Sequence, residues 1–468
     1  MNTSTDFDLI IVGSGPGGYV AAIRASQLKM RVCLIERSDL GGVCLNWGCI
    51  PTKTLLHTAT TLSAFQNAAS LGIQVPDGLG IDIKRVVQRS RDVAKTLGLG
   101  VSALLKKNQV TVVQGSARLL GAGQVEVSNP QKTQKPQCLH AKNIIIATGA
   151  SPRDIRGFPV DGKGVWNYKH ALTPEKIPSS LLILGAGAIG MEFASFYAAL
   201  GSQVTLAEQQ SRILPQEDEE VSAWMLKAFT QRKISVRVNT TATLLESVSG
   251  RSSVSLTQQG NSETLAFEQV LVCAGVIGNT QDMGLENTNI IPHNGCISTD
   301  FYGQTSEPNI FAIGDVSGAP MLAHKASHQG MRCVEHIAGL NNPISTHAIP
   351  ACTYSDPQVA SMGLTESEAR AQHPNIAVGR FPLHGNGKAL AIGKPEGFIK
   401  TLFDQDTGAF LGAHMVGSDV TELLHGLTLA QQLEATEDDL IQHMFAHPTL
   451  SEALGESVMA AYGRAIHI

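Results

Sequence analysis

The chain lacks the marks of a secreted or membrane-spanning protein. Its first residues show no basic region followed by an apolar one, so we expect no secretory signal. One stretch, Leu181–Leu200, imitates a membrane span because Glu192 is its only charge. It also carries three glycines spaced as in phosphate-binding loops, which favours a buried strand and helix over a bilayer segment. We therefore expect a cytoplasmic protein with no membrane partner.

Charge and cysteine are both scarce. Charged residues make up only 16% of the 468, which is not the composition of a disordered tail protein. A net charge of −5 argues against a nucleic-acid binder, which needs a basic surface. Eight cysteines are too few for a secreted disulfide scaffold. Six are isolated, and we interpret them as small core or surface residues: Cys33, Cys138, Cys273, Cys296, Cys333 and Cys352.

Glycine, in contrast, is abundant and falls into a repeated pattern. The chain has 46 glycines in 468 residues, about one residue in ten, whereas ~7% is usual. This excess suggests many tight βα turns. An apolar run, a glycine-rich turn, a helical pattern and a second apolar run ending in an acid occur at 9–36 and again at 181–208. The two copies lie 172 residues apart, and in each the acid follows the first glycine by 23 positions.

Each copy has the spacing of a dinucleotide-binding turn. The first glycine allows a tight turn out of the strand, the second lets the backbone approach a pyrophosphate, and the third permits close helix–strand packing. The acid would accept hydrogen bonds from ribose hydroxyls. A lone glycine motif is weak, but both copies lie between a strand and a helix, so we expect two bound dinucleotides. The residues concerned are Gly13, Gly15, Gly18 and Glu36 in the first copy, and Gly185, Gly187, Gly190 and Glu208 in the second.

These copies organise the rest of the chain, whose length suggests about three domains at ~150 residues each. We expect an α/β fold with two Rossmann-like dinucleotide-binding domains and a C-terminal α+β domain. Helical patterns fill about 53–107, and strands ending at about 149, 275 and 315 follow. The expected division is 1–150 for the first nucleotide domain, 151–277 for the second, 278–348 for a central domain completing the first site, and 349–468 for the interface domain.

Cys44 and Cys49 form the most informative pair in the chain. Four residues separate them within Gly41–Lys53, a segment that begins five residues after Glu36. Structural zinc normally needs four ligands, and no second cysteine pair accompanies this one, so we expect no metal. A structural disulfide closing so short a loop would contribute only ~2 kcal/mol. We interpret the pair as redox-active, with a following helix and Lys53 able to lower a thiol pKa.

Together these features resemble the pyridine nucleotide–disulfide oxidoreductases along essentially the whole chain. Besides the two glycine turns, four stretches carry the resemblance: 41–53, 321–326, 354–360 and 447–452. The resemblance implies that the first turn binds FAD and the second binds the nicotinamide nucleotide. It also implies oxidation of dihydrolipoamide to lipoamide, with NAD⁺ as acceptor, through a Cys44–Cys49 disulfide.

The resemblance gives roles to single residues. Cys44 would be the thiol that meets the substrate, and Cys49 the thiol that faces the flavin. His447 would deprotonate the incoming dithiol and would be oriented by Glu452. An imidazole suits this role because its reference pKa of ~6.5 lies near working pH.

Further residues follow for the cofactors. Lys53 and Glu192 would form an ion pair near flavin N5, since a buried charge such as Glu192 needs a partner. The resemblance places Gly115 near the adenine, Asp315 on the ribityl chain and Ala323 beside the flavin ring. The remaining cofactor-binding candidates are Thr148, Gly149 and Gly275.

NAD is expected over NADP because Glu208 would repel a 2′-phosphate and accept the ribose 2′-OH. Gln209 and Gln210 after it are neutral, although Arg212 is nearby. A related NAD(P)H-dependent reductase acting on another small disulfide stays as an alternative.

The resemblance also implies partners. The substrate would be carried on a lipoylated acyltransferase or carrier protein, and the protein would dock on a 2-oxoacid dehydrogenase complex core. A role chiefly as that docking component is the second alternative. The resemblance further implies a symmetric homodimer in which His447 and Glu452 reach the Cys44 site of the other subunit.

Overall fold

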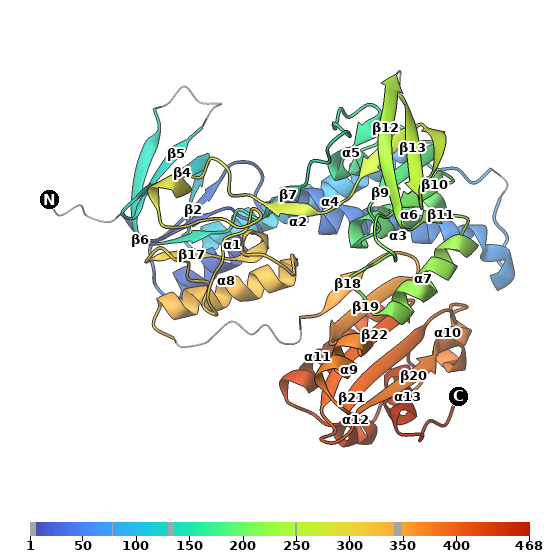
Figure 1. The fold of residues 1–468 in the computed structure, drawn as a ribbon. Coiled ribbons are helices and arrows are strands. Elements are labelled where there is room, and N and C mark those ends of the chain that lie inside the picture. The colour runs from blue at the N-terminus through green and yellow to red at the C-terminus, as the bar shows by residue number, and fades with distance from the viewer. Residues whose placement is uncertain (1–5, 77, 130–134, 249, 341–348) are drawn as a thin grey trace. The chain divides into compact units, whose positions relative to one another are not determined.

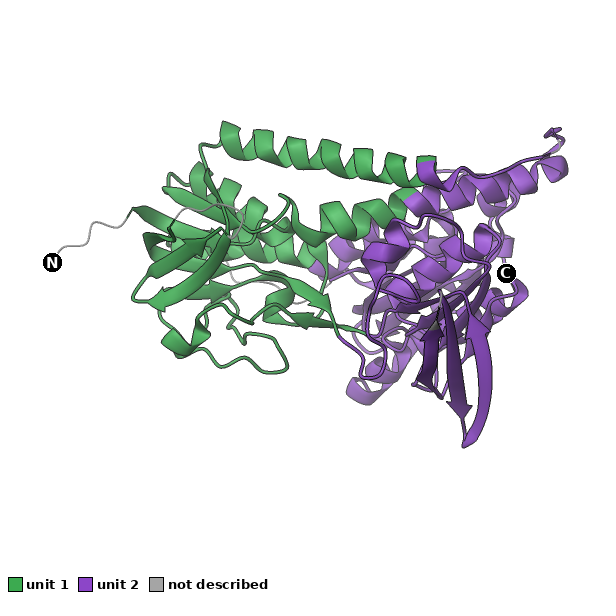
Figure 2. Cartoon of the chain, turned by 90° about the horizontal axis from the view of Figure 1, so that it is seen from above, with its two compact units in different colours: residues 1–54, 85–153, 275–345 green, residues 55–84, 154–274, 346–468 purple. Residues whose placement is uncertain are grey.

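The computed structural model describes residues 6–76, 78–129, 135–248, 250–340 and 349–468. The chain forms two compact units, drawn in different colours in Figure 2. The first contains 1–54, 85–153 and 275–345, and the second contains 55–84, 154–274 and 346–468. Two sequence-based expectations lie outside the described residues: the absence of a signal at 1–5, and the end of the central domain at 341–348.

A parallel sheet lies at the centre of the first unit (Figure 1). Its parallel strands run in the order β3 (Thr111–Gln114), β2 (Val32–Glu36), β1 (Phe7–Val12), β6 (Gln137–Ile146) and β17 (Ile310–Ala312). Two antiparallel strands, β5 (Gln124–Ser128) and β4 (Ser116–Gly121), continue from β6. Because β17 pairs with β6, the segment after 278 returns to the sheet that carries the first glycine turn.

Both faces of this sheet are covered, which explains the continuous apolar run in β1. Leu9 and Ile11 pack on the side of α1 (Pro16–Gln27), α4 (Ile83–Lys107) and α8 (Ala323–Ile337). Ile10 and Val12 pack on the other side with residues of β4 and β5. The redox segment forms α2 (Gly42–Trp47) and the start of α3 (Cys49–Gln66). The smaller elements of this unit are β7 (Ala150–Pro152), β16 (Val276–Gly278), η2 (Leu285–Asn287) and η3 (Gly314–Ser317).

The second unit repeats the parallel arrangement. Its sheet runs β11 (Ser235–Arg237), β10 (Gln203–Ala207), β9 (Ser180–Leu184), β15 (Gln269–Val272) and β8 (Val165–Trp166). The stretch that imitates a membrane span is strand β9 followed by helix α6 (Ala188–Ala199), and no helix among the described residues is long and apolar enough to cross a bilayer. The other elements here are η1 (Ala68–Leu71), α5 (Tyr168–Leu172), α7 (Glu219–Gln231) and the antiparallel β12 (Thr240–Val248), β13 (Arg251–Gln258) and β14 (Asn261–Phe267).

An antiparallel sheet follows in the C-terminal part of the same unit. Its strands run β18 (Ala351–Thr353), β19 (Gln358–Gly363), β22 (Phe410–Gly417), β21 (Phe398–Asp404) and β20 (Ile376–Pro382). Its helices are α9 (Glu366–Gln372), η4 (Leu383–Gly385), α10 (Gly387–Ala391), η5 (Val420–Glu422), α11 (Leu424–Gln432), α12 (Glu437–Gln442) and α13 (Glu452–Ala461). The sheet and its helices share one apolar core.

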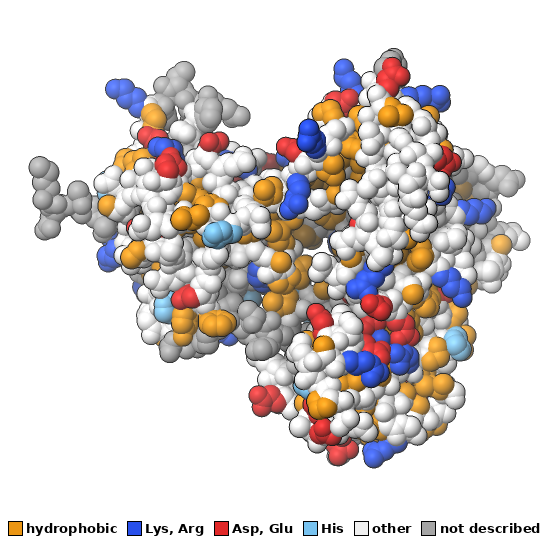
Figure 3. Space-filling model, in the orientation of Figure 1, with side chains coloured by type: hydrophobic (Ala, Val, Ile, Leu, Met, Phe, Trp, Pro, Cys, Tyr) orange, Lys and Arg blue, Asp and Glu red, His pale blue; other side chains and the backbone are white. Residues whose placement is uncertain are grey.

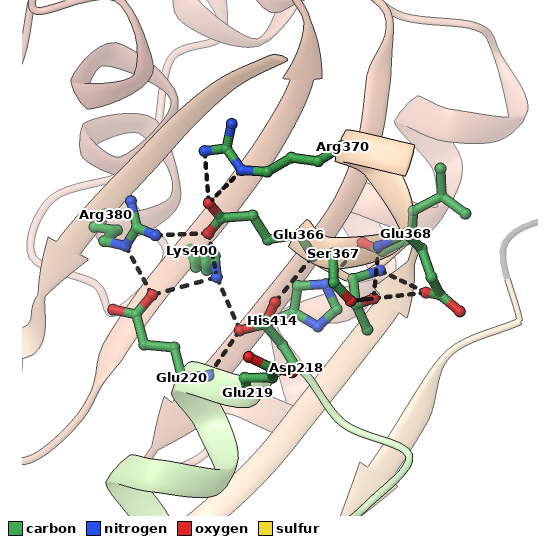
Figure 4. A network of polar contacts seen from close by, with 12 residues as sticks. Asp218, Glu219, Glu220, Glu366, Ser367, Glu368, Arg370, Arg380, Lys400 and His414 are labelled. Atoms are coloured by element: carbon green, nitrogen blue, oxygen red, sulfur yellow. Dashed lines mark hydrogen bonds and ion pairs between the residues drawn. The ribbon is translucent and has the colours of Figure 1, made fainter. Parts of the chain in front are cut away.

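A buried ion network joins α7 to this last sheet. The side chain of Lys400 is 2% exposed, and its Nζ lies 2.8 Å from Asp218 Oδ1 and 2.7 Å from Glu366 Oε2 (Figure 4). Glu220 lies 3.2 Å from the same ammonium and also binds Arg380. A buried charge needs such partners, so the network fixes where α7 meets the sheet. In Figure 3, side chains of both signs gather over this part of the surface.

Candidate active site

The first glycine turn has the geometry that its spacing predicts. Gly13 has φ +102°, and a Cβ there would lie 2.4 Å from the carbonyl oxygen of Ala147. A Cβ on Gly18 would lie 1.8 Å from Gly13 O, whereas one on Gly15 would meet no atom within 4 Å. Gly15 is also the N-cap of α1, and no side chain caps that helix. The second glycine therefore leaves open space at uncapped N–H groups, which suits a pyrophosphate.

Glu36 is already held by hydrogen bonds from the turn. Its Oε2 accepts from the backbone N–H of Ser14 at 2.8 Å and from the Ser14 hydroxyl at 2.6 Å. Its Oε1 accepts from Ser38 N at 2.8 Å. A carboxylate offers about four acceptor positions, so about one is left for a ribose hydroxyl. The sequence did not reveal Ser14 as part of the site, since a serine inside a glycine turn carries no separate signal.

The second turn repeats this backbone geometry. Gly185 also has φ +102°, and a Cβ on Gly190 would lie 2.0 Å from Gly185 O. A Cβ on Gly187 would meet no described atom within 4 Å. Gly187 is the N-cap of α6 and provides no side-chain hydrogen bond to that helix. Glu208 accepts from Ala186 N at 2.8 Å and from the backbone of Gln210 at 2.9 Å. The residues of both turns thus fit a dinucleotide.

The redox segment begins against the first turn. Gly42 has φ +61°, and a Cβ there would lie 2.7 Å from Gly15 Cα. Gly41 N donates to Ser14 O at 3.1 Å. These contacts bring the start of the Cys44-containing helix α2 next to Gly15, where a pyrophosphate is expected.

Cys44 and Cys49 lie within hydrogen-bond distance of each other. The hydrogen bond with Cys49 raises the pKa of the Cys44 thiol far above its usual value, burial raises it further, and the charge of Lys53 acts in the opposite direction. The sequence-based expectation that the helix and Lys53 lower the pKa of one thiol of the pair stays a prediction, and the effect of Lys53 on Cys44 has the expected sign. The neighbouring sulfur and the loss of solvent outweigh the nearby cation.

The segment that returns to the first unit adds an acid beside the thiols. Asp315 lies in η3, and burial raises the pKa of its carboxyl group while Lys325 opposes this. The negative charge of Asp315 is among the causes that raise the pKa of Cys44. Ala323 is the first residue of α8. The expected flavin contacts of Asp315 and Ala323 stay predictions.

The other candidates of the first unit form hydrogen bonds that connect segments of this unit. Gly115 N donates to Glu36 O at 2.8 Å, which joins it to the end of β2. The Thr148 hydroxyl donates to Asn279 O at 2.8 Å, and Gly149 O accepts from Asn279 N at 2.9 Å. Gly275, the last cofactor-binding candidate, also belongs to this unit, whereas the second glycine turn belongs to the other.

His447 and Glu452 are brought together in the second unit. His447 Nδ1 lies 2.9 Å from Glu452 Oε1, and Thr449 N donates to Glu452 Oε2 at 2.8 Å. The backbone hydrogen bond from Thr449 lowers the pKa of Glu452, and the hydrogen bond with His447 lowers it further. Glu452 is therefore ionised at neutral pH, which fixes the Nδ1–H tautomer of a neutral His447 and leaves Nε2 as the basic nitrogen. The His447 side chain is 78% exposed.

Glu192 is buried on α6 and accepts from Tyr354 N at 2.9 Å. Lys53 lies in the first compact unit and Glu192 in the second, so their ion pair stays a prediction.

Comparison with known proteins decides the family. Residues 7–330 match the sequence model for pyridine nucleotide-disulphide oxidoreductases, and residues 349–458 match the model for the dimerisation domain of these proteins. The chain belongs to the pyridine nucleotide-disulphide oxidoreductase family. This assignment confirms the predicted α/β fold with a dimerisation domain and the predicted cofactors, FAD and NAD.

Individual relatives match nearly end to end. The chain is 49% identical to a dihydrolipoyl dehydrogenase of Zymomonas mobilis over 98% of this chain and 99% of the relative. It is 44% identical to a dihydrolipoyl dehydrogenase of Rhizobium etli, over 98% and 99% respectively. Among solved structures, LpdA from Mycobacterium tuberculosis superposes with a TM-score of 0.88 at 25% identity, over 96% of this chain and 98% of that one. The flavoprotein disulfide reductase RclA from Escherichia coli, as a Cu(II) complex, gives 0.86 at 25% identity, over 97% and 98%.

Proposed function

We propose that this protein is a dihydrolipoyl dehydrogenase, which oxidises protein-bound dihydrolipoamide to lipoamide with NAD⁺ through FAD and the Cys44–Cys49 pair. The observation that carries the proposal is the contact between the two thiols in a segment that starts against the first glycine turn. The full-length relatives that bear this name support it.

The two cysteines would exchange electrons with the substrate by thiol–disulfide chemistry. One thiolate of the substrate attacks Cys44 Sγ, the Cys44–Cys49 bond breaks, and Cys49 leaves as a thiolate. The second substrate sulfur then attacks the mixed disulfide, which releases cyclic lipoamide and the Cys44 thiol. Two electrons thus pass from the substrate to the cysteine pair. Bound FAD supplies the two-electron exchange between that pair and NAD⁺.

His447 would be the base for this step. Glu452 holds its Nδ1–H, so Nε2 faces outward and accepts the proton of the incoming thiol. The high exposure of His447 fits a group that completes a site on a second subunit, and the match to the dimerisation domain supports a homodimer. Lys53 and Glu192 would form the ion pair beside the flavin.

NAD is favoured over NADP by the charges at the second turn. Glu208 would repel a 2′-phosphate. Arg212, the cation that could bind such a phosphate, lies 3.0 Å from Glu219 Oε1 and donates to Pro215 O at 3.2 Å. With its guanidinium engaged there, Arg212 gives less support to NADP than its sequence position suggests.

The physiological partners belong to the same proposal. The dithiol would be presented on a lipoylated acyltransferase or carrier protein, and the homodimer would dock on the core of a 2-oxoacid dehydrogenase complex in the cytoplasm. Docking and catalysis are compatible. A role in docking alone would not explain the adjacent pair of cysteines or the two glycine turns.

The test is a single sulfur-to-oxygen change. Cys49→Ser should abolish NADH formation from NAD⁺ and dihydrolipoamide while docking to an acyltransferase core survives. Cys138→Ser, which alters an exposed isolated cysteine, is the matched control and should keep full activity. Full complementation of a deletion strain by Cys49→Ser would favour the docking role. Faster turnover of another small disulfide than of lipoamide would favour a different reductase.

A further inference from the structure

Helix α4 holds the redox segment through three consecutive side chains. Arg89 Nη1 donates to Thr54 O at 3.3 Å, and the hydroxyl of Ser90 donates to Pro51 O at 3.3 Å. Arg91 Nη1 donates to the carbonyl oxygen of Asn46 at 2.6 Å. The first two contacts fall on helix α3, after the cysteines. Only the Arg91 contact falls between them.

Arg91 makes a second contact with the same stretch. Its guanidinium carbon lies 4.5 Å from the centroid of the Trp47 ring. A cation over an indole face is attracted by the ring, and the attraction grows when the pair is desolvated. Arg91 therefore touches both residues that precede Gly48, where α2 ends and α3 is about to begin.

The other polar atoms of Arg91 show that its side chain is held inside the protein. Its Nε and Nη2 are buried, and the residues that the structure describes offer them no hydrogen-bond partner. Burial lowers the pKa of the guanidinium, against the charge of Asp39. Burying unpaired donors costs free energy. A side chain that served only to keep the surface soluble would turn into solvent and avoid this cost. Lysine could not replace this arrangement, because it lacks the flat face that stacks on an indole.

The position of this stretch matters because disulfide geometry is narrow. The two Cα atoms must lie about 4.4–6.8 Å apart for the bond to close without strain. The chain from Cys44 to Cys49 crosses the break between two helices at Gly48. Restricting Asn46 and Trp47 keeps the two thiols close together, which favours the closed disulfide over the open dithiol.

We propose that Arg91 is a positioning residue that fixes Asn46 and Trp47 between the two cysteines and thereby sets the equilibrium between the Cys44–Cys49 disulfide and the dithiol. This inference rests on the proposed redox role of the pair and adds a residue outside the Gly41–Lys53 segment to it.

The equilibrium can be measured without turnover. The FAD-loaded protein is equilibrated anaerobically with mixtures of reduced and oxidised dithiothreitol, quenched in acid and alkylated, and the peptides are weighed. The reagent closes to its cyclic disulfide, the bond between Cys44 and Cys49 breaks, and two electrons and two protons pass to the cysteines. The fraction of doubly alkylated peptide gives the equilibrium constant.

Arg91→Gln should shift this constant towards the dithiol by about tenfold, which is ~30 mV for a two-electron couple. Arg91→Lys keeps the charge and loses the stacked plane, so it should shift the constant nearly as far. Lys95→Gln removes an exposed cation one turn further along α4 and should leave the constant unchanged. A wild-type value in Arg91→Lys would overturn the claim that the guanidinium plane positions the segment.

A double-mutant cycle makes the test specific to the Arg91–Trp47 contact. Trp47→Leu removes the ring, and the effects of Arg91→Gln and Trp47→Leu should combine to less than their product. Independent effects would overturn the proposal, whatever the thermal stability of the variants. If the unmodified protein forms no Cys44–Cys49 bond at any poise, the proposed function itself fails. If the bond forms and the Arg91 variants match the wild type, only the role of Arg91 fails.

Discussion

The two glycine turns, one in each compact unit, share a backbone and differ in how their acids are held. Gly13 and Gly185 both have φ +102°, and in each turn a Cβ on the third glycine would collide with the carbonyl oxygen of the first. Glu36 accepts three hydrogen bonds from the turn and its flank, whereas Glu208 accepts two. The difference comes from Ser14, which stands where the second turn has an alanine.

The motif performs two tasks, one through its glycines and one through its acid. The glycines serve the backbone and are equally demanding in both turns. The acid of the first turn, Glu36, has about one acceptor position left, and in the proposed function it fixes the loop at the FAD site. Glu208 in the second turn keeps more free acceptor capacity, and in the proposed function it distinguishes NAD from NADP. Variants in matching positions should therefore have unequal consequences.

The largest effect is expected from Gly18→Ala. The added methyl would lie 1.8 Å from a backbone oxygen, so the strand–helix junction must move, at a cost of ~3 kcal/mol or more in the free energy of unfolding. FAD content after gel filtration should fall sharply. Gly190→Ala, with the same clash in the second turn, should retain FAD and lose NADH binding. Gly426→Ala, a helical position with open space around it, is the control. Stoichiometric FAD in Gly18→Ala would contradict the account.

The second effect concerns nucleotide choice. Glu208→Gln keeps the shape of the side chain and one of its two acceptor oxygens, and it removes the charge that opposes a 2′-phosphate. The ratio of kcat/KM for NADPH to that for NADH should therefore rise about tenfold, or ~1.4 kcal/mol. Steady-state kinetics with both nucleotides measures this ratio. The matching variant Glu36→Gln should lower FAD retention and leave the ratio unchanged. An equal ratio in wild type and Glu208→Gln would show that another group selects the nucleotide.

A third effect, of similar size, is expected when the first turn is made to resemble the second. Ser14→Ala removes one buried hydrogen bond to the Glu36 carboxylate, worth ~1.5 kcal/mol in the free energy of unfolding. Urea denaturation of the FAD-loaded protein measures the loss. Ala186→Ser should not destabilise the second turn by a comparable amount. If Ser14→Ala proves neutral, the difference between the two acids has no energetic meaning.

The smallest effect is a pH dependence at the sheet of the second unit. The ammonium group of Lys176 and the hydroxyl and backbone of Ser179 lower the pKa of Glu268 from its usual range to about 2. A depressed carboxyl pKa stabilises the fold above its unfolded value near ~4.3, and this contribution is lost as pH falls towards 2. After screening, Glu268→Gln should cost ~1 kcal/mol at pH 7 and nothing at pH 2. Urea denaturation of the wild type and of Glu268→Gln across this pH range measures the difference in the free energy of unfolding. A difference that stays constant with pH would contradict the assignment. In the first unit, the backbone of Arg31 and the side chain of Lys142 likewise lower the pKa of Asp8, which lies in β1.

Much of the site could be predicted from local spacing. The glycine turns follow a fixed pattern of residue types along the chain, so the pattern was sufficient to predict them. The His447–Glu452 contact was predicted from the resemblance of 447–452 to the family. Ser14 and Arg91 could not be found this way, because their roles depend on partners 22 and 45 residues away. The raised pKa of Cys44 could not be predicted, because the sequence shows the helix and Lys53 and does not show that Cys49 forms a hydrogen bond with Cys44.

The central claim is that two electrons pass through Cys44 and Cys49. The direct measurement is anaerobic addition of one equivalent of dihydrolipoamide to the purified yellow protein, followed by alkylation, peptide mass analysis and an absorption spectrum. We predict two alkyl groups on the peptide that contains both cysteines, with a new long-wavelength thiolate–flavin band. Bleaching of the flavin while that peptide stays unalkylated would contradict the account.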